Sequence, residues 1–149
     1  MDSDFSLAMQ TARAVGDLGP LVATIPYAAF IGITAKLVDG DVVAELGGGQ
    51  RTIGNPELPA LHGGTIGALL ESAALFKLML EADVVELPKT VTITIDYLRS
   101  ARPAPTFARA IIARQGRRVA SVRVEAWQQD PSKPVAAAHA HFLLKTPSR

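Results

Sequence analysis

Polar and hydrophobic residues alternate without a break in the run KTVTITIDYL, residues 89–98. Successive side chains of a strand point to opposite faces, so this alternation predicts a half-buried strand. One predicted face is apolar and the other is polar: Val91, Ile93, Ile95 and Tyr97 on the first, and Thr90, Thr92, Thr94 and Asp96 on the second. The pattern therefore places Thr90 on the face opposite Ile93.

Other patterns predict helices. Residues 62–82 are apolar almost throughout, and after two weakening glycines they are good helix formers. Residues 4–15 predict a short amphipathic helix, which residues 16–20 end. A helix that is apolar on nearly every side is buried on most of its surface. One sheet covers one side of the long helix, so we expect a second subunit to cover the rest.

The remaining runs predict strands. Asp39-Gly40 separates two β-rich runs and indicates a hairpin, because glycine tolerates the positive φ of a tight turn. Residues 47–59 are rich in glycine and proline and are expected to form a loop. Three more strand-like runs follow the KTVTITIDYL strand, at residues 106–114, 119–129 and 135–145.

The predicted order is a hairpin, a long helix and a four-stranded meander. Such segregation argues for an α+β fold, an antiparallel sheet with one helix packed on it. The length of 149 residues suits a single domain, here residues 1–149, with residues 1–20 as an N-terminal helical extension.

Composition excludes several classes of function. Hydrophobic residues make up 48% of the chain, and the net charge is +1 with no basic stripe, so neither disorder nor nucleic-acid binding is expected. The absence of cysteine excludes thiolate catalysis, disulfides and cysteine-ligated zinc. The acidic start MDSDFSLAMQ does not have the form of a signal peptide, and the longest apolar tract is interrupted by polar residues. A cytoplasmic protein without a membrane partner is therefore expected.

Candidate chemistry gathers at the start of the long helix, in LHGGTIGALLESAAL. The free N–H groups of a helix N-terminus form a site for developing negative charge, and glycine lets a ligand approach the backbone. Glu71 follows two turns later, with no helical neighbour able to neutralise it. The structural alternatives are a plain loop-to-helix junction for HGG and a solvated strip for Glu71.

The HGG turn, the acid nine residues after the histidine and the TVTITIDYL strand together resemble the hotdog-fold acyl-CoA thioesterases of the phenylacetate-pathway, or PaaI-like, type. The resemblance extends over about residues 31–144. It implies a hotdog fold, a curved antiparallel sheet wrapped around a long central helix. It also implies a homodimer or a homotetramer, with active sites between subunits that bind the thioester of coenzyme A.

The resemblance also implies roles for single residues. Glu71 matches the family's helical acid, and the backbone N–H of Gly63 matches the donor that polarises the thioester carbonyl. His62 matches the histidine that shapes the turn. Thr90 matches a residue that places the water or the carboxylate. Asn55 matches an upstream asparagine, although it lies seven residues before the histidine rather than six.

Substrate contacts are expected at Gly64 and, in an acyl pocket shared with the partner subunit, at Leu75, Phe76 and Met79. Arg117 and Arg118 follow Gly116, where a hairpin edge could present them to the phosphates of coenzyme A. A solvated turn is the simpler alternative for both arginines, and Lys89 and Arg99 have similar standing.

Three further residues invite a functional interpretation. His139 and His141 share one strand face, but two histidines without further ligands do not make a zinc site, so packing in the core or an interface is expected. Trp127 is likewise expected in the core or an interface. No metal or cofactor is expected beyond the coenzyme A of the substrate.

The main hypothesis is hydrolysis of an acyl-CoA thioester, with Glu71 as general base or as nucleophile. Gly63 and Glu71 lie some 12 Å apart along one helix at about 1.5 Å per residue. Gly63 of one subunit is therefore expected to work with Glu71 of the partner subunit. The alternatives are a hotdog module that binds acyl-CoA without hydrolysing it, and a hydratase or dehydratase. The latter enzymes place an acid and a histidine differently. The acyl group is left open.

Overall fold

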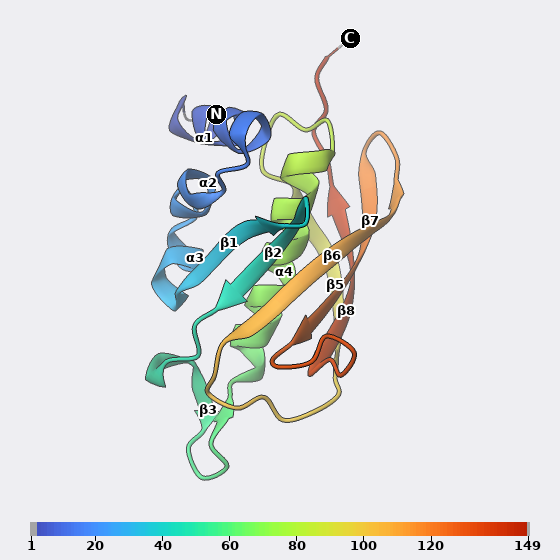
Figure 1. Cartoon of the computed structure of the whole chain (residues 1–149). Helices are drawn as coiled ribbons and strands as arrows, with labels where there is room; N and C mark the ends of the chain where they lie inside the picture. Colours follow the sequence, from blue (N-terminus) through green and yellow to red (C-terminus); the bar gives the residue numbers. More distant parts are fainter. Residues whose placement is uncertain (1–2, 149) are drawn as a thin grey trace.

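The long helix α4 (Gly63–Glu81) lies in the hollow of a curved six-stranded sheet (Figure 1). This arrangement is seen in a computed structural model that describes residues 3–148. The two residues before Ser3, which belong to the predicted N-terminal extension, and Arg149 lie outside that range. The α+β prediction is confirmed, as are the long helix and the hairpin.

All neighbouring strands of the sheet are antiparallel, in the order β1-β2-β6-β7-β8-β5. The turn between the first two strands contains positive φ at Asp39 (52°) and Gly40 (79°), as a two-residue hairpin turn requires. The strands are β1 (Ile33–Val38), β2 (Asp41–Leu46), β5 (Lys89–Tyr97), β6 (Thr106–Gln115), β7 (Val119–Trp127) and β8 (Ala136–Leu143).

The predicted four-stranded meander is wrong in one respect. β6, β7 and β8 form a meander, but β5 lies at the far edge of the sheet and pairs with β8. Chain order placed β5 beside β6, whereas the segment after Tyr97 crosses to the other side of the sheet. As a result, β5 runs along α4 with one edge open.

The inner face of the sheet is built mainly from small side chains. Buried alanines line it, and the bulk of the core comes from α4, whose Leu69, Leu70, Phe76 and Met79 are fully buried. Small residues on the sheet let the helix come close to the strands. The buried alanines are Ala44 on β2, Ala108 and Ala110 on β6, Ala120 and Ala126 on β7, and Ala136, Ala138 and Ala140 on β8.

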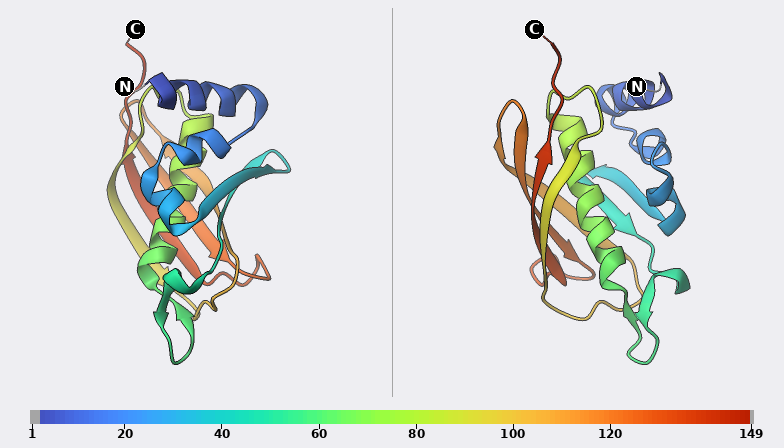
Figure 2. Two further views of the ribbon diagram at one scale, coloured as in Figure 1. Left: turned by 90° about the vertical axis from the view of Figure 1, so that its left-hand side faces the viewer. Right: turned by 180° about the vertical axis from the view of Figure 1, so that it is seen from behind.

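Three N-terminal helices cover part of the other side of α4, beside β1 (Figure 2). They are α1 (Ser3–Val15), α2 (Gly19–Ala23) and α3 (Pro26–Ile31). The helical segment thus continues beyond residue 20, because prolines at the first turns of α2 and α3 restart the helix. By length and composition alone α4 could cross a membrane, but a buried core helix meets the same criterion.

Two polar contacts fix the C-terminal half of α4. The guanidinium of Arg13 on α1 donates to the carbonyl oxygens of Met79, Ala82 and Val84 at 2.9–3.1 Å. These include carbonyls that the end of a helix leaves without partners. Arg13 therefore joins the N-terminal helices to the end of α4.

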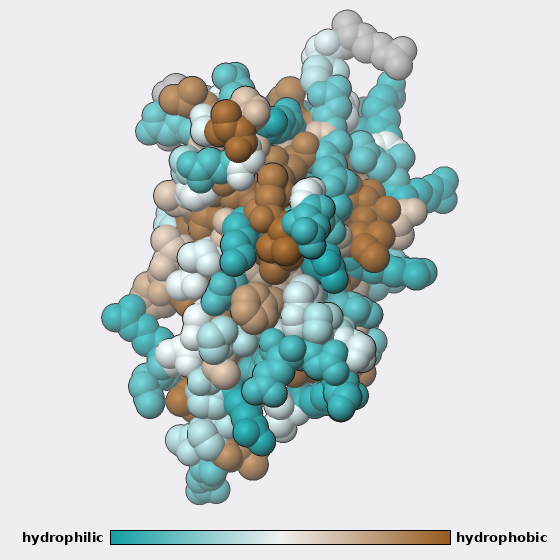
Figure 3. Space-filling model, in the orientation of Figure 1, coloured by the Kyte–Doolittle hydropathy of each residue, from teal (hydrophilic) through white to brown (hydrophobic). Residues whose placement is uncertain are grey.

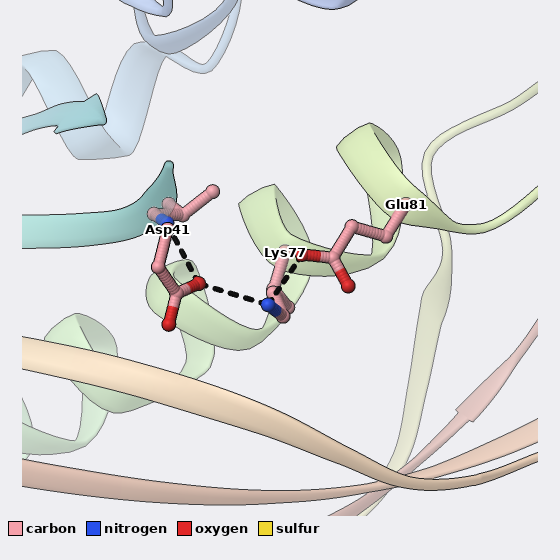
Figure 4. A network of polar contacts seen from close by, with 4 residues as sticks. Asp41, Lys77 and Glu81 are labelled. Atoms are coloured by element: carbon pink, nitrogen blue, oxygen red, sulfur yellow. Dashed lines mark hydrogen bonds and ion pairs between the residues drawn. The ribbon is translucent and has the colours of Figure 1, made fainter. Parts of the chain in front are cut away.

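Lys77 lies between two carboxylates, Asp41 at the start of β2 and Glu81 one turn along α4 (Figure 4). Its ammonium is 2.8 Å from the Asp41 carboxylate, and its side chain is 13% exposed. Burial alone would lower the pKa of Lys77, but the hydrogen bonds to Asp41 and Glu81 outweigh it and raise the pKa above the ordinary value of 10.5.

The face shown in Figure 3 is mostly polar, with an apolar patch between the N-terminal helices and β6. Leu37 and Val38 at the end of β1 are partly exposed, and Ile111 on β6 is 66% exposed. Single exposed apolar side chains of this kind are normal on protein surfaces.

Candidate functional site

The N-terminus of α4 is capped by a histidine. His62 has extended backbone angles, and its Nδ1 accepts a hydrogen bond from the Gly64 N–H at 2.8 Å. In this contact the Nδ1 of His62 acts as a hydrogen-bond acceptor. Within residues 3–148 the Gly63 N–H has no acceptor. The free donor of this turn is therefore Gly63, whereas the N–H of Gly64, a predicted substrate contact, is occupied.

A second glycine makes room for this turn. Gly54 lies on β3 (Ile53–Asn55), which pairs with β4 (Ala60–Leu61) ahead of the helix. A Cβ on Gly54 would lie 2.6 Å from the His62 Cα, too close for any side chain. The predicted loop over residues 47–59 thus contains a short strand and the 3-10 helix η1 (Gln50–Thr52), which position His62. Sequence reasoning missed Gly54, whose single signal is its place ahead of HGG.

Glu71 is half-buried on the side of α4 that lies along the edge strand β5. Its carboxylate accepts a hydrogen bond from the Thr90 hydroxyl at 2.5 Å. A short O–H···O⁻ bond of this kind is charge-assisted and directional. The partner that Glu71 lacks on its own helix is therefore supplied by β5.

Thr90 reaches Glu71 because β5 contains a bulge. Thr90 pairs with Phe142 and Thr92 with His141, so Val91 is the extra residue and is 61% exposed. The prediction that Thr90 lies on the face opposite Ile93 is wrong, because the bulge reverses the alternation at this point. Thr90 and Ile93 both face α4.

Asn55 is used within its own turn. Its side-chain oxygen accepts from the backbone N–H groups of Glu57 and Leu58 at 3.0 and 3.3 Å. Within residues 3–148 it makes no hydrogen bond to Glu71 or Thr90. The geometry thus gives Asn55 a local turn-forming contact.

The predicted acyl-pocket residues are in unlike environments. Leu75 is half-buried and lies one turn further along α4 than Glu71. Phe76 and Met79 have no exposed surface and belong to the core of the domain. In a single copy of the chain neither Phe76 nor Met79 presents a surface to a ligand, and their contact with the acyl group stays a prediction.

Arg117 and Arg118 lie on the exposed turn between β6 and β7. Arg118, Lys89 and Lys145 line a cavity of about 290 Å³ near the end of β5 that carries Thr90. Lys145 forms an ion pair with Glu86, and this hydrogen bond holds the pKa of the Glu86 carboxyl below its ordinary value of 4.5. A basic cluster thus lies closer to Glu71 than to Gly63 of the same chain, because Lys89 adjoins Thr90.

His139 and His141 are exposed on the outer face of β8, with ring centroids 5.2 Å apart. They contact the hydroxyls of Ser121 and Thr92. Core packing is therefore ruled out for both histidines. Among residues 3–148, no group of three His, Asp or Glu side chains is placed to hold a metal ion. Trp127 is half-buried, stacks on Phe107 and lies under Arg109.

Comparisons with known proteins agree with this architecture. The family model of the Thioesterase superfamily matches residues 58–135. A search of curated proteins gave no significant match. A crystal structure of a protein from Chromobacterium violaceum is 40% identical, with a TM-score of 0.75 over 99% of this chain and 100% of that one.

Two more distant structures show the same fold. A Bacillus halodurans protein crystallised with CoA is 21% identical, with a TM-score of 0.72 over 97% of this chain and 88% of that one. A mutant of the phenylacetic acid degradation protein PaaI from Thermus thermophilus is 24% identical, with a TM-score of 0.65 over 80% of this chain and 98% of that one.

Proposed function

The chain belongs to the thioesterase superfamily and has the hotdog fold, and from this premise we propose that it hydrolyses acyl-CoA thioesters to the free acid and coenzyme A. One observation carries the proposal. The helix that begins with a free N–H at Gly63 also bears Glu71, which is held by Thr90. An oxyanion donor and an oriented carboxylate are the two groups that thioester hydrolysis needs.

The Gly63 N–H is proposed to bind the thioester carbonyl oxygen. This oxygen becomes negatively charged when the carbonyl carbon is attacked. A backbone N–H at a helix N-terminus stabilises that charge, and removal of one such donor costs about 10²–10³ in kcat in other enzymes. The neighbouring Gly64 N–H cannot share the task while it donates to His62.

Glu71 is proposed to supply the base or the nucleophile. As a base, its carboxylate takes a proton from water, the resulting hydroxide attacks the thioester carbon, and the C–S bond breaks to release the CoA thiolate. As a nucleophile, it forms a mixed anhydride with loss of the thiolate, and water then cleaves the anhydride. In either route the Thr90 hydroxyl orients one carboxylate oxygen.

The active site is proposed to lie between two copies of the chain. Eight helical steps of about 1.5 Å each lead from Gly63 to Glu71, too far for both to contact one carbonyl group. The open edge of β5 and the partly exposed side of α4 beside it are the surfaces that a second copy would cover. The Gly63 of one protomer would then face Glu71 of the other.

Coenzyme A is the proposed leaving group. A structural relative was crystallised with CoA. The basic side chains of Lys89 and Arg118 lie beside the β5 end that carries Thr90, together with Lys145, which is paired with Glu86. Basic side chains there suit the phosphates of the nucleotide. The half-buried Leu75 is proposed to line the acyl pocket.

The direct test is thiol release from a panel of short-chain, medium-chain and aryl acyl-CoAs. Glu71→Gln keeps the size of the side chain and its contact with Thr90 but removes the base, so kcat should fall by about 10³-fold or more. Thermal unfolding should stay close to wild type. Unchanged turnover in this variant would refute the assignment of Glu71. Ligand-induced stabilisation of the wild type without thiol release would instead favour a non-hydrolytic acyl-CoA-binding module.

A matched pair of variants tests the Gly63 donor. Gly63→Pro removes the N–H, and proline is well tolerated at the first position of a helix. Gly63→Ala adds a Cβ at the same place, about 3.2 Å from the Tyr97 ring, but keeps the N–H. The proline variant should therefore lose much more activity than the alanine variant. Equal activity in the two would exclude the Gly63 N–H as the oxyanion donor.

Mixing tests the shared site. A heterodimer of Glu71→Gln and Gly63→Pro protomers contains one intact pair of residues if the site spans two subunits. Refolding the two variants together in equal amounts should then restore about a quarter of wild-type activity, since half of the dimers are mixed and each has one working site. A site within one chain would give no recovery.

A further inference from the structure

We propose that Tyr97 is a positioning residue for the Gly63 donor, and that it acts by fixing the peptide unit between Gly63 and Gly64. The effect of Tyr97 on catalysis rests on the proposed function. The fixing of the peptide unit rests only on contacts within this chain. Tyr97 comes from the end of β5, so the strand contributes directly to the geometry of the helix start.

The Gly63–Gly64 peptide is held at both ends. The Tyr97 hydroxyl donates to the Gly63 carbonyl oxygen at 2.7 Å, and the Gly64 N–H donates to His62 Nδ1 at 2.8 Å. A peptide unit is planar, so two opposed hydrogen bonds fix the orientation of the whole unit.

The preceding peptide, which carries the Gly63 N–H, is held on its carbonyl side. The His62 oxygen accepts from the Thr65 N–H at 3.0 Å, the Thr65 hydroxyl at 2.7 Å and the Ile66 N–H at 3.3 Å. With both peptides fixed, the two torsions of Gly63 are fixed as well. The Gly63 N–H is then the one group of this turn that is oriented but unoccupied.

This turn needs outside support because its residues are glycines. Glycine allows a wide range of backbone angles, and helix ends fray. The Tyr97 ring occupies the space that a side chain would fill, since a Cβ on Gly63 would meet three ring and hydroxyl atoms at 3.2–3.3 Å. Gly67 lies against Ile95 in the same way, at 3.0 Å. The absence of side chains at Gly63 and Gly67 thus lets β5 pack closely on α4, and this packing restricts the backbone angles of the two glycines.

A donor fixed in advance stabilises a developing oxyanion without reorganisation when the reaction occurs. Tyr97 is not a catalytic residue in this account, because its proton is committed to the Gly63 carbonyl. It also borders a cavity of about 360 Å³ whose wall includes Gly63 and Ile66. The ring and the hydroxyl therefore have separable contributions, packing beside the cavity and orientation of the peptide.

Tyr97→Phe separates the two contributions, because it keeps the ring over Gly63 and removes the hydroxyl. We expect kcat for thiol release to fall about tenfold with little change in KM, since the oxyanion forms after the substrate binds. Tyr27→Phe is the matched control. Tyr27 is 57% exposed on α3, and its hydroxyl makes no hydrogen bond within residues 3–148.

Amide hydrogen exchange gives a readout that does not depend on activity. In Tyr97→Phe the Gly64 amide should exchange at least several-fold faster than in wild type, because one of the two bonds that hold its peptide is lost. Tyr27→Phe should leave this rate unchanged. A Tyr97→Phe variant with wild-type kcat, or with lower kcat but unchanged Gly64 exchange, would overturn the positioning role. If the wild type releases no thiol, the proposed function fails and the exchange rate alone decides the role of Tyr97.

Discussion

Thr90→Val is the sharpest test of how the Glu71 carboxylate is held. Valine has nearly the shape of threonine but cannot donate a hydrogen bond. The substitution therefore removes the 2.5 Å bond to the Glu71 carboxylate and leaves the packing of β5 against α4 in place. We expect a loss of activity without a loss of stability.

The size of the effect follows from the type of bond. A hydrogen bond to a charged group contributes about 1.5–3 kcal/mol net. Because 1.36 kcal/mol corresponds to a tenfold change in rate, kcat/KM should fall about 10- to 150-fold if the bond is needed in the transition state. The effect should be smaller than that of Glu71→Gln, since the carboxylate itself remains.

The assay is the initial rate of thiol release from the best acyl-CoA of the panel, together with urea unfolding. Thr90→Ser is the control, because serine restores the hydroxyl without the methyl group and should recover most of the activity. The role given to Thr90 would be refuted if kcat/KM of Thr90→Val lay within about twofold of wild type, since this is well below the range expected for a charge-assisted bond. A large loss of stability in Thr90→Val would show that the hydroxyl serves the fold instead.

Two further predictions concern the C-terminal half of α4. Arg13→Met should lower the free energy of unfolding, measured in urea, by about 2–3 kcal/mol, because three carbonyl oxygens lose a charged donor. Arg13→Lys should lower it less. A methionine variant as stable as wild type would contradict the capping role. Lys77→Met should cost about 1 kcal/mol near neutral pH. Since the pKa of Lys77 is raised on folding, the extra stability of wild type over Lys77→Met should be complete below pH 10.5 and disappear as the pH rises further. Urea unfolding at several pH values measures this difference, and a difference that persists at high pH would contradict the prediction.

The alternating pattern predicted the strand β5 correctly, but it did not predict on which face of the sheet the first side chains of β5 lie. Alternation assumes one residue per step, and a bulge adds one. The sequence offers no sign of the bulge at Val91, because valine suits both an inner and an exposed strand position. Thr90 was nevertheless assigned to the site through the family resemblance, and the bulge supplies the physical reason why it can contact Glu71.

Topology was predicted less well than the elements. Local patterns cannot distinguish β5 beside β6 from β5 beside β8, because pairing depends on how the segment after Tyr97 crosses the sheet. His139 and His141 alternate with alanines on β8, and the sequence does not show which of the two sets is buried. The structure buries the alanines and exposes the histidines. Tyr97 was predicted on the apolar face and does lie against α4, but its hydroxyl bond to Gly63 depends on the tertiary structure.

The alanine-lined face of the sheet has a consequence for how this domain can change over time. A methyl group cannot become smaller without losing the side chain, and any larger group would push α4 outward. At eight positions of the sheet the close approach of α4 thus depends on the smallest available side chain. Exchange at similar volume is open to the large core residues of the helix and to the valine, leucine and phenylalanine positions of the sheet, but not to the alanines. Over evolutionary time the alanines are therefore expected to vary less than the large residues of the core.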